Sequence, residues 1–222
     1  MRRGLVSEVF VTESALSRFG TMVADVPVHV VTDRAAKALS DTVTPVGLVA
    51  VCSLPETTLR DVLAKSPRLV AVAVEISEPG NAGTLIRVAD AMGADAVVLA
   101  GHSVDPYNGK CLRASAGSIF AVPVVSEPDA PTAVAALGEA GLQVLATTID
   151  GEVSLDETDL SAPTAWLFGP EAHGLPSDLA GRATHRVHIP MPGNAESLNV
   201  ASAAAICLYQ SARHRATTER QP

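Results

Sequence analysis

The chain has 222 residues, 47% of them hydrophobic and only 3% aromatic, and its formal net charge at pH 7 is −8. This length is enough for one or two domains with a sizeable core, and the composition is typical of a soluble globular protein. No apolar run approaches the roughly 18 residues that a membrane span requires, so no membrane partner is expected. Polar and charged residues come soon after Arg2 and Arg3, so no signal peptide is expected either.

The cysteines and the charge distribution restrict the partners. Cys52, Cys111 and Cys207 are widely spaced and form no CxxC pair or Cys/His cluster. They therefore indicate free thiols in a cytoplasmic protein and no metal site. A negative net charge argues against a nucleic-acid partner, but residues 1–68 hold eight Lys or Arg against seven Asp or Glu. A basic face on this first segment is compatible with that balance, so the charge count alone decides nothing.

The first segment, residues 1–56, predicts a small α/β unit. Residues 57–68 are expected to form a linker with a short helix. Within the first segment, strands are expected at 5–11, 28–31 and 47–52, and short helices at 13–19 and 32–39.

From Leu69 onward, strands and helices alternate regularly. Residues 69–76 form a nearly continuous apolar run, which is typical of a strand in a parallel sheet covered on both faces. The alternation predicts a mostly parallel sheet in a layered α/β domain. The polar residues 216–222 are expected to be a frayed tail. Further strands are expected at 96–100, 122–125, 144–147, 164–168 and 186–189, and helices at 84–92, within 106–118, at 131–140 and at 197–213.

Three stretches carry candidate chemistry, and the first is residues 75–87, EISEPGNAGTLIR. A strand end leads into a Pro/Gly loop and a helix that Asn81 could cap, which is a favourable place for an anionic group. Arg87 lies one turn into the helix and off its apolar stripe, so its guanidinium can reach back over the loop. An exposed arginine in an ordinary loop–helix connection is an equally good interpretation of this stretch alone. A nicotinamide dinucleotide fold is disfavoured, because no GxGxxG occurs.

The second stretch, residues 166–176, reads WLFGPEAHGLP. A strand delivers Gly169, Glu171 and Gly174, and glycines around one carboxylate suit a ligand held by backbone groups in the crevice of an open α/β sheet. Taken alone, a residue such as Glu171 is more often a loop carboxylate that accepts local amide bonds. His173 is interpreted as a solvated loop histidine and not as a general base.

The third stretch, residues 189–209, reads IPMPGNAESLNVASAAAICLY. Gly193 lets its Pro/Gly loop approach a ligand closely, and Ser197 can cap the last helix and leave amide donors directed at the loop. Alone, this would be a ligand loop of unknown kind. One face of the helix is narrow enough for another helix to pack closely against it, and that face carries Ala201, Ala204, Ala205 and Leu208.

In order and spacing, the three stretches resemble the three motifs of the SpoU (TrmH-like) ribose 2'-O-methyltransferases, over about residues 69–213. The first motif, an Asn, a Gly and an Arg, is met by Asn81, Gly83 and Arg87. The second, Gly-x-Glu-x-x-Gly-Leu, is met by Gly169, Glu171, Gly174 and Leu175. The third, Ile-Pro-Met-x-Gly and then Ser-Leu-Asn-Val, is met by Ile189, Pro190, Met191, Gly193, Ser197, Leu198, Asn199 and Val200.

The resemblance implies a fold that the alternation alone does not. It implies an α/β domain, here residues 69–215, whose carboxyl-terminal segment is threaded through a loop as a deep trefoil knot, where an unknotted doubly wound sheet would otherwise be expected. It also implies a homodimer that packs the knot region together, which suits the alanine face of the last helix. Arg87 would then serve a site whose cofactor is bound mainly by the partner. The implied cofactor is S-adenosylmethionine, bound largely by backbone groups near Thr147, Gly169, Ile189, Met191 and Leu198.

The implied activity is methyl transfer to the ribose 2'-hydroxyl of RNA, with ribosomal RNA favoured over transfer RNA. Residues 1–56 look like the RNA-binding domain of ribosomal-protein type that precedes the knot in many members, here without its first helix. Arg87 would clamp a phosphate and stabilise the developing alkoxide, because a protonated guanidinium is a poor base at neutral pH. The other implied catalytic residues, which hold Arg87, the ribose and the cofactor by hydrogen bonds, are Asn81, Glu171, Ser197 and Asn199.

Two other classes of function stay open. A catalytically silent RNA-binding member would keep the knot, but the intact set of five polar motif residues argues against it. A knotted methyltransferase acting on a base nitrogen is the other alternative. The Asn/Arg first motif and the Ser-Leu-Asn of the third favour the ribose, and a transfer RNA substrate is the alternative within that class.

Overall fold

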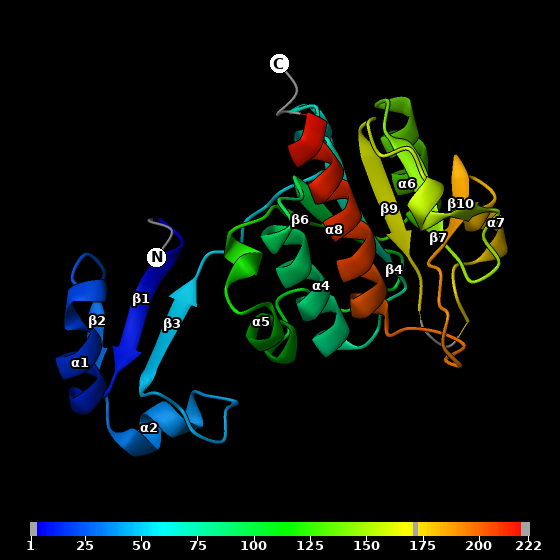
Figure 1. The fold of residues 1–222 in the computed structure, drawn as a ribbon. Helices are drawn as coiled ribbons and strands as arrows, with labels where there is room; N and C mark the ends of the chain where they lie inside the picture. The colour runs from blue at the N-terminus through cyan, green and yellow to red at the C-terminus, as the bar shows by residue number, and fades with distance from the viewer. Residues whose placement is uncertain (1–3, 171–172, 219–222) are drawn as a thin grey trace. The chain divides into compact units, whose positions relative to one another are not determined.

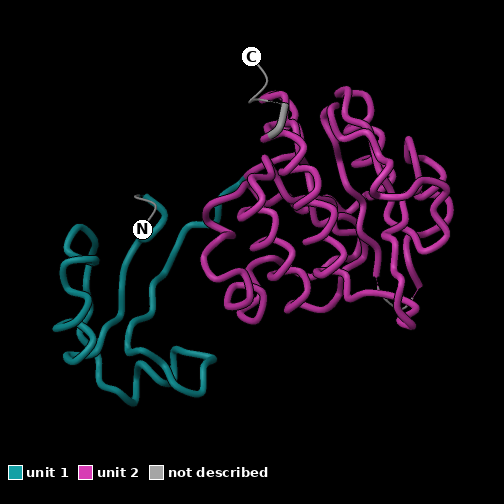
Figure 2. The backbone as a smooth tube through the Cα atoms, in the orientation of Figure 1, with its two compact units in different colours: residues 1–56 teal, residues 57–222 magenta. Residues whose placement is uncertain are grey.

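The computed structural model describes residues 4–170 and 173–218. The chain forms two compact units, Met1–Glu56 (unit 1) and Thr57–Pro222 (unit 2), which Figure 2 shows in different colours. Each unit has hydrophobic clusters of its own.

Unit 1 is a three-stranded sheet with two helices. Its central strand β1 pairs in parallel with β2 and antiparallel with β3. The side chains of Thr12 and Thr32 cap the helices by accepting hydrogen bonds from the backbone N–H groups of Ala15 and Ala35. The strands and helices expected in this segment are confirmed. They are β1 (Val6–Val11), α1 (Glu13–Phe19), β2 (Val28–Val30), α2 (Asp33–Ala38) and β3 (Leu48–Cys52), with a 3-10 turn at Gly20–Met22.

Unit 2 is built on a seven-stranded sheet of order β6-β5-β4-β9-β7-β10-β8, in which the neighbouring strands run parallel. The predicted parallel α/β sheet is therefore confirmed. Strands β4, β5 and β9 are buried along their whole length, as their uninterrupted apolar runs indicate. Strand β8 has two residues and no clear signal in the sequence. The strands are β4 (Leu69–Val74), β5 (Ala96–Ala100), β6 (Val124–Glu127), β7 (Gln143–Thr147), β8 (Val153–Ser154), β9 (Thr164–Phe168) and β10 (His185–His188).

Helices cover both faces of this sheet, which gives the unit three layers (Figure 1). On one face, α4, α5 and α8 pack on a cluster that contains Trp166 and Phe168. On the other face, α3, α6 and α7 pack on a cluster that contains Leu167, because successive residues of a strand point to opposite faces. The helices are α3 (Leu59–Leu63), α4 (Pro79–Ala91), α5 (Gly109–Ser115), α6 (Ala130–Glu139), α7 (Ser177–Ala180) and α8 (Val200–Thr218), with 3-10 turns at Ser118–Phe120 and Leu155–Glu157.

Two kinds of feature are absent from the described ranges. None of the helices there is both long and apolar enough to cross a bilayer. No group of three or more His, Cys, Asp or Glu side chains in those ranges could hold a metal ion.

Residues 57–68 belong to unit 2 and do not form a free linker. The expected short helix is α3, and its first turn is closed by a capping box between Thr58 and Asp61. Leu59 and Val62 are buried in the cluster on the face opposite α4. This apolar pair at three-residue spacing is what fixes the segment to the sheet.

Helix α4 begins at Pro79, earlier than the expected start at Thr84. Its N-cap is Glu78, whose carboxylate accepts a hydrogen bond from the backbone N–H of Asn81 at 2.8 Å. The expectation that Asn81 caps this helix is therefore wrong. Proline favours the first helical position because its φ is already helical and its missing N–H is not needed there.

Helix α8 begins at Val200, later than the expected start at Ser197, and continues to Thr218, beyond the expected end at Arg213. Its first turn is capped by Asn199, whose Oδ1 accepts hydrogen bonds from Ala201 N at 3.0 Å and Ser202 N at 3.4 Å. The expectation that Ser197 caps this helix is therefore wrong. The tail expected at 216–222 is helical as far as Thr218, and its last four positions, 219–222, lie outside the described residues.

Most of the alanine face of α8 is used inside the chain. Ala204 and Leu208 are fully buried, and α8 packs against α4. The indole Nε1 of Trp166 donates a buried hydrogen bond of 2.9 Å to Ser211 Oγ, which ties α8 to β9. The helix that packs on this face is thus α4 of the same chain.

Gly83 marks the closest approach of α4 to α5. A Cβ at this position would lie 2.7 Å from the Cβ of Ala114 and closer still to the Cys111 carbonyl. We expect Gly83→Ala to destabilise the protein by about 1–3 kcal/mol, because two packed backbones must separate. Gly138→Ala on α6 is the matched control, since nothing lies within 4 Å of its Cβ position. That variant should gain about 0.5 kcal/mol from helix propensity, and equal unfolding curves for the two variants would contradict the packing explanation.

Candidate cofactor pocket and catalytic residues

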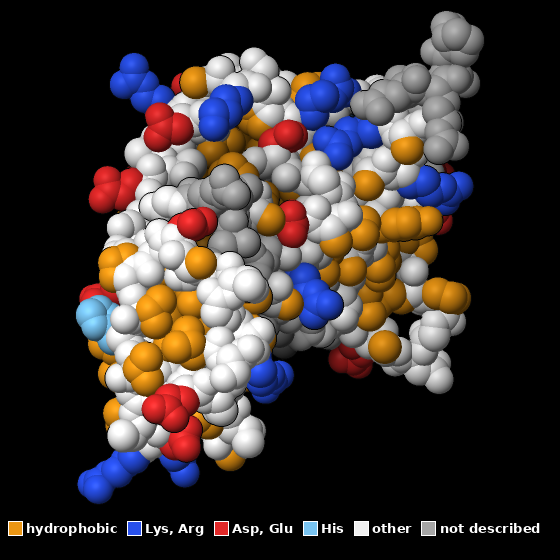
Figure 3. All heavy atoms as spheres, turned by 90° about the vertical axis from the view of Figure 1, so that its left-hand side faces the viewer, with side chains coloured by type: hydrophobic (Ala, Val, Ile, Leu, Met, Phe, Trp, Pro, Cys, Tyr) orange, Lys and Arg blue, Asp and Glu red, His pale blue; other side chains and the backbone are white. Residues whose placement is uncertain are grey.

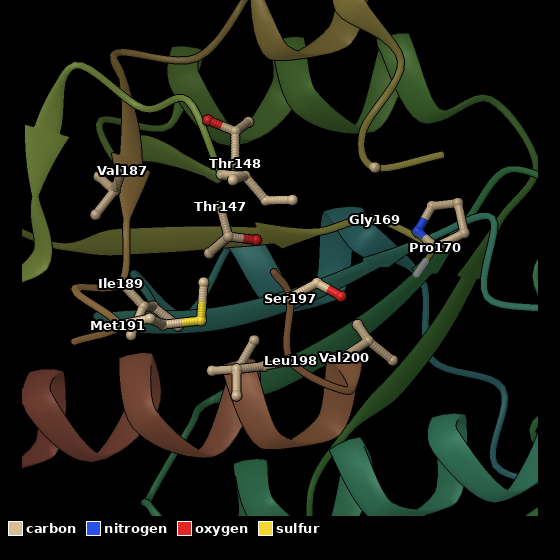
Figure 4. Close-up of a pocket in the computed structure, with 13 residues that line it drawn as sticks. Thr147, Thr148, Gly169, Pro170, Val187, Ile189, Met191, Ser197, Leu198 and Val200 are labelled. Carbon is tan, nitrogen blue, oxygen red and sulfur yellow. The ribbon is translucent and has the colours of Figure 1, made fainter. Parts of the chain in front are cut away.

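A pocket lies at the carboxyl ends of the adjacent strands β9, β7 and β10 (Figure 4). Ligands of open α/β sheets bind in this position. The loop that enters α8 closes the pocket on one side. Its lining residues are Thr147, Thr148, Ile149, Gly169, Pro170, Gly174, Val187, Ile189, Met191, Ser197, Leu198, Val200 and Ala203.

The lining is uncharged in the described part of the chain, and most of it is apolar or backbone. In Figure 4, Ile189, Met191 and Leu198 lie along one side, and Gly169 and Pro170 lie across from them. These apolar side chains suit a flat, uncharged ring system, while loop backbone groups can supply hydrogen bonds. The five residues that the sequence assigns to a cofactor all line this pocket, and they are Thr147, Gly169, Ile189, Met191 and Leu198.

Two neighbouring threonines differ in what they offer to a ligand. The hydroxyl of Thr147 donates to the Leu167 carbonyl at 2.8 Å, so this side chain braces the sheet and leaves its backbone for the pocket. The hydroxyl of Thr148 is buried and has no hydrogen-bond partner in the described ranges. A buried hydroxyl without a partner at a pocket wall is typical of a place where a ligand or water binds.

The glycines of the second motif have a structural reason. A Cβ at Gly169 would lie 2.5 Å from Leu175 N, so the end of β9 passes directly against the segment that returns from the loop. Gly174 has a φ of +67°, a conformation that other residues rarely adopt. Glu171, between these glycines, lies outside the described residues.

The first and third motifs meet at a pair of asparagines. Asn199 Nδ2 donates a hydrogen bond to Asn81 Oδ1 at 3.1 Å, although the two residues are 118 positions apart in the chain. Leu198 and Val200, on either side of Asn199, line the pocket, as does Ser197. Of the five expected catalytic residues, all but Glu171 are described. The fold gathers three of them, Asn81, Ser197 and Asn199, around the loop that enters α8.

Arg87 is not brought to the pocket of its own chain. It is exposed on α4 and does not line the pocket. In the described ranges, its guanidinium takes part in none of the hydrogen bonds or ion pairs. This cation is therefore available to bind an anion from outside the chain.

Glu78 and Lys110 are two residues of this region that the motif analysis does not single out. The ammonium of Lys110, on α5, binds the Glu78 carboxylate that caps α4. The hydrogen bond from Lys110, and then the one from Asn81 N, lower the pKa of Glu78. A carboxylate directly before a proline at the start of a helix is the signal that indicates such a cap.

This pair predicts an acid-dependent stability difference. A carboxyl whose pKa is lowered on folding stabilises the protein above its unfolded pKa, and this is lost as the pH falls through the folded value. We expect Glu78→Gln to melt at a lower temperature than the wild type at about pH 7, and the two to converge towards about pH 3. Melting temperatures measured across this range test it, with Glu139→Gln at the exposed end of α6 as control. A difference that does not change with pH would mean that the charge of Glu78 is not the cause.

A parallel sheet with an uncharged pocket at the carboxyl ends of its strands is typical of α/β proteins that bind a cofactor or another small ligand. A family profile described as SpoU rRNA Methylase family matches residues 68–209. The chain therefore belongs to the SpoU rRNA methylase family, and the resemblance seen in the three motifs is confirmed.

Curated relatives and solved structures agree with this family. A 23S rRNA (guanosine(2553)-2'-O)-methyltransferase of Bacillus subtilis is 35% identical over 206 residues, which cover 93% of this chain and 80% of the relative. A 23S rRNA (uridine(2479)-2'-O)-methyltransferase of Streptomyces viridochromogenes is 35% identical over 176 residues, 77% of this chain and 61% of the relative. An AdoMet-bound rRNA methyltransferase from Sinorhizobium meliloti matches with a TM-score of 0.84 at 30% identity, covering 95% of this chain and 81% of that chain.

Proposed function

We propose that this chain is an S-adenosylmethionine-dependent RNA 2'-O-ribose methyltransferase that acts on ribosomal RNA. The observation that carries the proposal is the Asn81–Asn199 contact beside an uncharged pocket at the carboxyl ends of β7, β9 and β10. It joins the first and third family motifs next to the place where a cofactor fits. The relatives named as 23S rRNA 2'-O-methyltransferases support ribosomal RNA as the substrate.

The donor set of the pocket fits S-adenosylmethionine. Apolar side chains on one side suit the adenosyl group, loop backbone groups can bind its polar edges, and the Thr148 hydroxyl adds a buried donor. When bound, this cofactor supplies an electrophilic methyl group. The residues assigned to hold it, chiefly through their backbone groups, are Thr147, Gly169, Ile189, Met191 and Leu198.

Arg87 is assigned to the RNA. An exposed guanidinium can bind a phosphate in a fork and stabilise the negative charge that develops on the 2'-oxygen as its proton leaves. Arginine stays protonated at neutral pH, so we assign it this electrostatic role and not that of a base. The residues assigned to position Arg87, the ribose and the cofactor by hydrogen bonds are Asn81, Ser197, Asn199 and Glu171, the last outside the described residues.

The proposal includes the trefoil knot and the homodimer that the family resemblance implies. Exposed Ile206 and Tyr209 on the outer side of α8 support a second chain at this helix. Arg87 would then reach the site of the partner, which accounts for its absence from the pocket of its own chain.

Unit 1 is proposed to bind the RNA substrate. The rings of Phe10 and His29 stack with their centroids 5.1 Å apart on one face of its sheet, and aromatic surfaces of this kind can stack on unpaired bases. On the face shown in Figure 3, Lys and Arg side chains are interspersed with Asp and Glu side chains and with apolar patches. Because ribosomal RNA is the proposed substrate, a cytoplasmic location is part of this proposal.

Transfer of a labelled methyl group tests the function. S-adenosylmethionine carrying the label is incubated with the protein and with unmodified ribosomal or transfer RNA, run side by side, with Arg87→Ala as control. We expect label in ribosomal RNA, located on the ribose by nucleoside analysis. Label in transfer RNA only, or on a base nitrogen, would overturn the proposed substrate or position, and cofactor binding without transfer would indicate a silent RNA-binding protein.

A further inference from the structure

The loop between β7 and β8 forms one wall of the pocket, and it is tied to β10 at three successive residues. Thr148 and Ile149 of this loop line the pocket. The next three residues, Asp150, Gly151 and Glu152, each bind to β10. This dense anchoring contrasts with the exposure of Ile149, whose side chain is largely open to solvent.

Arg186 makes most of these bonds. Its Nε donates to Glu152 Oε2 at 2.9 Å, and its Nη1 donates to Asp150 Oδ2 at 3.2 Å. Its backbone N–H also donates to Glu152 Oε1 at 2.9 Å, so one carboxylate binds both the side chain and the main chain of β10. The hydrogen bond from the Arg186 backbone N–H, followed by the weaker contributions of the Arg186 side chain, lowers the pKa of Glu152.

Gly151 brings the two backbones into direct contact. A Cβ here would lie 2.6 Å from both His188 N and the Val187 carbonyl carbon. The carbonyl of Gly151 accepts a hydrogen bond from His188 Nδ1 at 2.9 Å. The loop therefore lies flat on β10, and any larger residue at this point would push it away.

The alternation of β10 connects this anchoring to the pocket. Arg186 and His188 bind the loop, whereas Val187, between them, and Ile189 line the pocket. In a strand, neighbouring side chains point to opposite faces. A shift of the loop along β10 would therefore change the distance between the pocket wall formed by Thr148 and Ile149 and the wall formed by Val187 and Ile189.

We propose that Arg186 and Glu152, with Asp150 and His188, are positioning residues that set the width of the cofactor pocket by holding the 148–152 loop on β10. This inference rests on the proposed function, because the ligand of the pocket is S-adenosylmethionine. Exposed ion pairs contribute little to stability in general. The ion pair between Arg186 and Glu152 instead fixes the position of the loop. Loss of this pair therefore affects cofactor affinity more than folding.

The test is calorimetric binding of S-adenosylmethionine by full-length variants. We expect Glu152→Ala to weaken binding about 10-fold or more, the size of one lost hydrogen bond to a charged group. Arg186→Ala should weaken it less, because Glu152 still binds the backbone N–H of residue 186. Arg186→Lys should restore part of the affinity, and Arg182→Ala, a nearby exposed arginine, should leave it unchanged.

Kinetics and folding controls separate positioning from a general structural effect. The KM for S-adenosylmethionine should rise in Glu152→Ala, while the turnover number at saturating cofactor and the KM for RNA stay at the wild-type values. Circular dichroism checks that the variants fold, and Arg186→Ala, which removes both side-chain bonds to the loop, replaces Glu152→Ala if that variant does not fold. Wild-type affinity in the folded variant would overturn this inference alone, whereas a wild-type protein that does not bind S-adenosylmethionine would overturn the proposed function with it.

Discussion

Replacing Arg87 by alanine should lower the turnover number for methyl transfer by about 10²-fold or more, with S-adenosylmethionine affinity unchanged. The magnitude is that of one lost electrostatic contact to the charge that develops in a transition state. Cofactor affinity should persist because Arg87 does not line the pocket and is exposed on α4. Steady-state rates with saturating cofactor and RNA measure the turnover number, and calorimetry measures the affinity for S-adenosylmethionine.

Two further variants define what Arg87 contributes. Arg87→Lys keeps the charge and loses the planar fork, so an intermediate rate would indicate bidentate phosphate binding. Arg60→Ala removes an equally exposed arginine from α3, which packs on the opposite face of the sheet, and should be fully active. A near-normal rate for Arg87→Ala would remove this residue from the catalytic set.

The Asn199 side chain should have two separable functions. Its Oδ1 caps α8 and its Nδ2 donates to Asn81, so Asn199→Ala loses the cap and the bond to Asn81. We expect this variant to lose about 1 kcal/mol of unfolding free energy from the cap. We also expect methyl transfer to fall at least about 10-fold, because Asn81 loses its link to the third motif.

Asn199→Asp separates the two effects. An aspartate keeps an oxygen that can cap α8 but cannot donate a hydrogen bond to Asn81, so stability should be kept and activity lost. Ser202→Ala, at an exposed position in the first turn of the same helix, is the control for the stability and the activity measurements. If Asn199→Asp were as active as the wild type, the Asn81 contact would have no catalytic importance and Asn199 would be only a helix cap.

Residues close together in sequence predict the elements of this fold well. The uninterrupted apolar runs identify β4, β5 and β9 because burial on both faces leaves no polar alternation. Helix starts were predicted less well. Asn81 and Ser197 are good capping residues, but Glu78 and Asn199 hold the caps, because Pro79 and the position of α8 against α4 decide where each helix begins.

The motifs predict which residues gather at the pocket but not how each one acts there. Gly83, assigned to a ligand motif, is required where α4 crosses α5, and the hydroxyl of Thr147 binds the sheet and not the pocket. The Lys110–Glu78 pair and the anchoring of the 148–152 loop by Arg186 have no motif at all. Each of these two contacts joins residues from different elements, so no spacing of residues along the chain indicates it.

Local pattern was therefore sufficient for the parallel α/β class, for the strands and helices other than β8 and α7, and for the family. These depend on burial, turn chemistry and short motifs, which involve neighbours in sequence. The order of the strands in the sheet, the meeting of Asn81 with Asn199 and the position of Arg87 outside the pocket lining depend on contacts between distant segments. Such contacts form only when the whole chain packs, and they determine which side chains line the pocket and which do not.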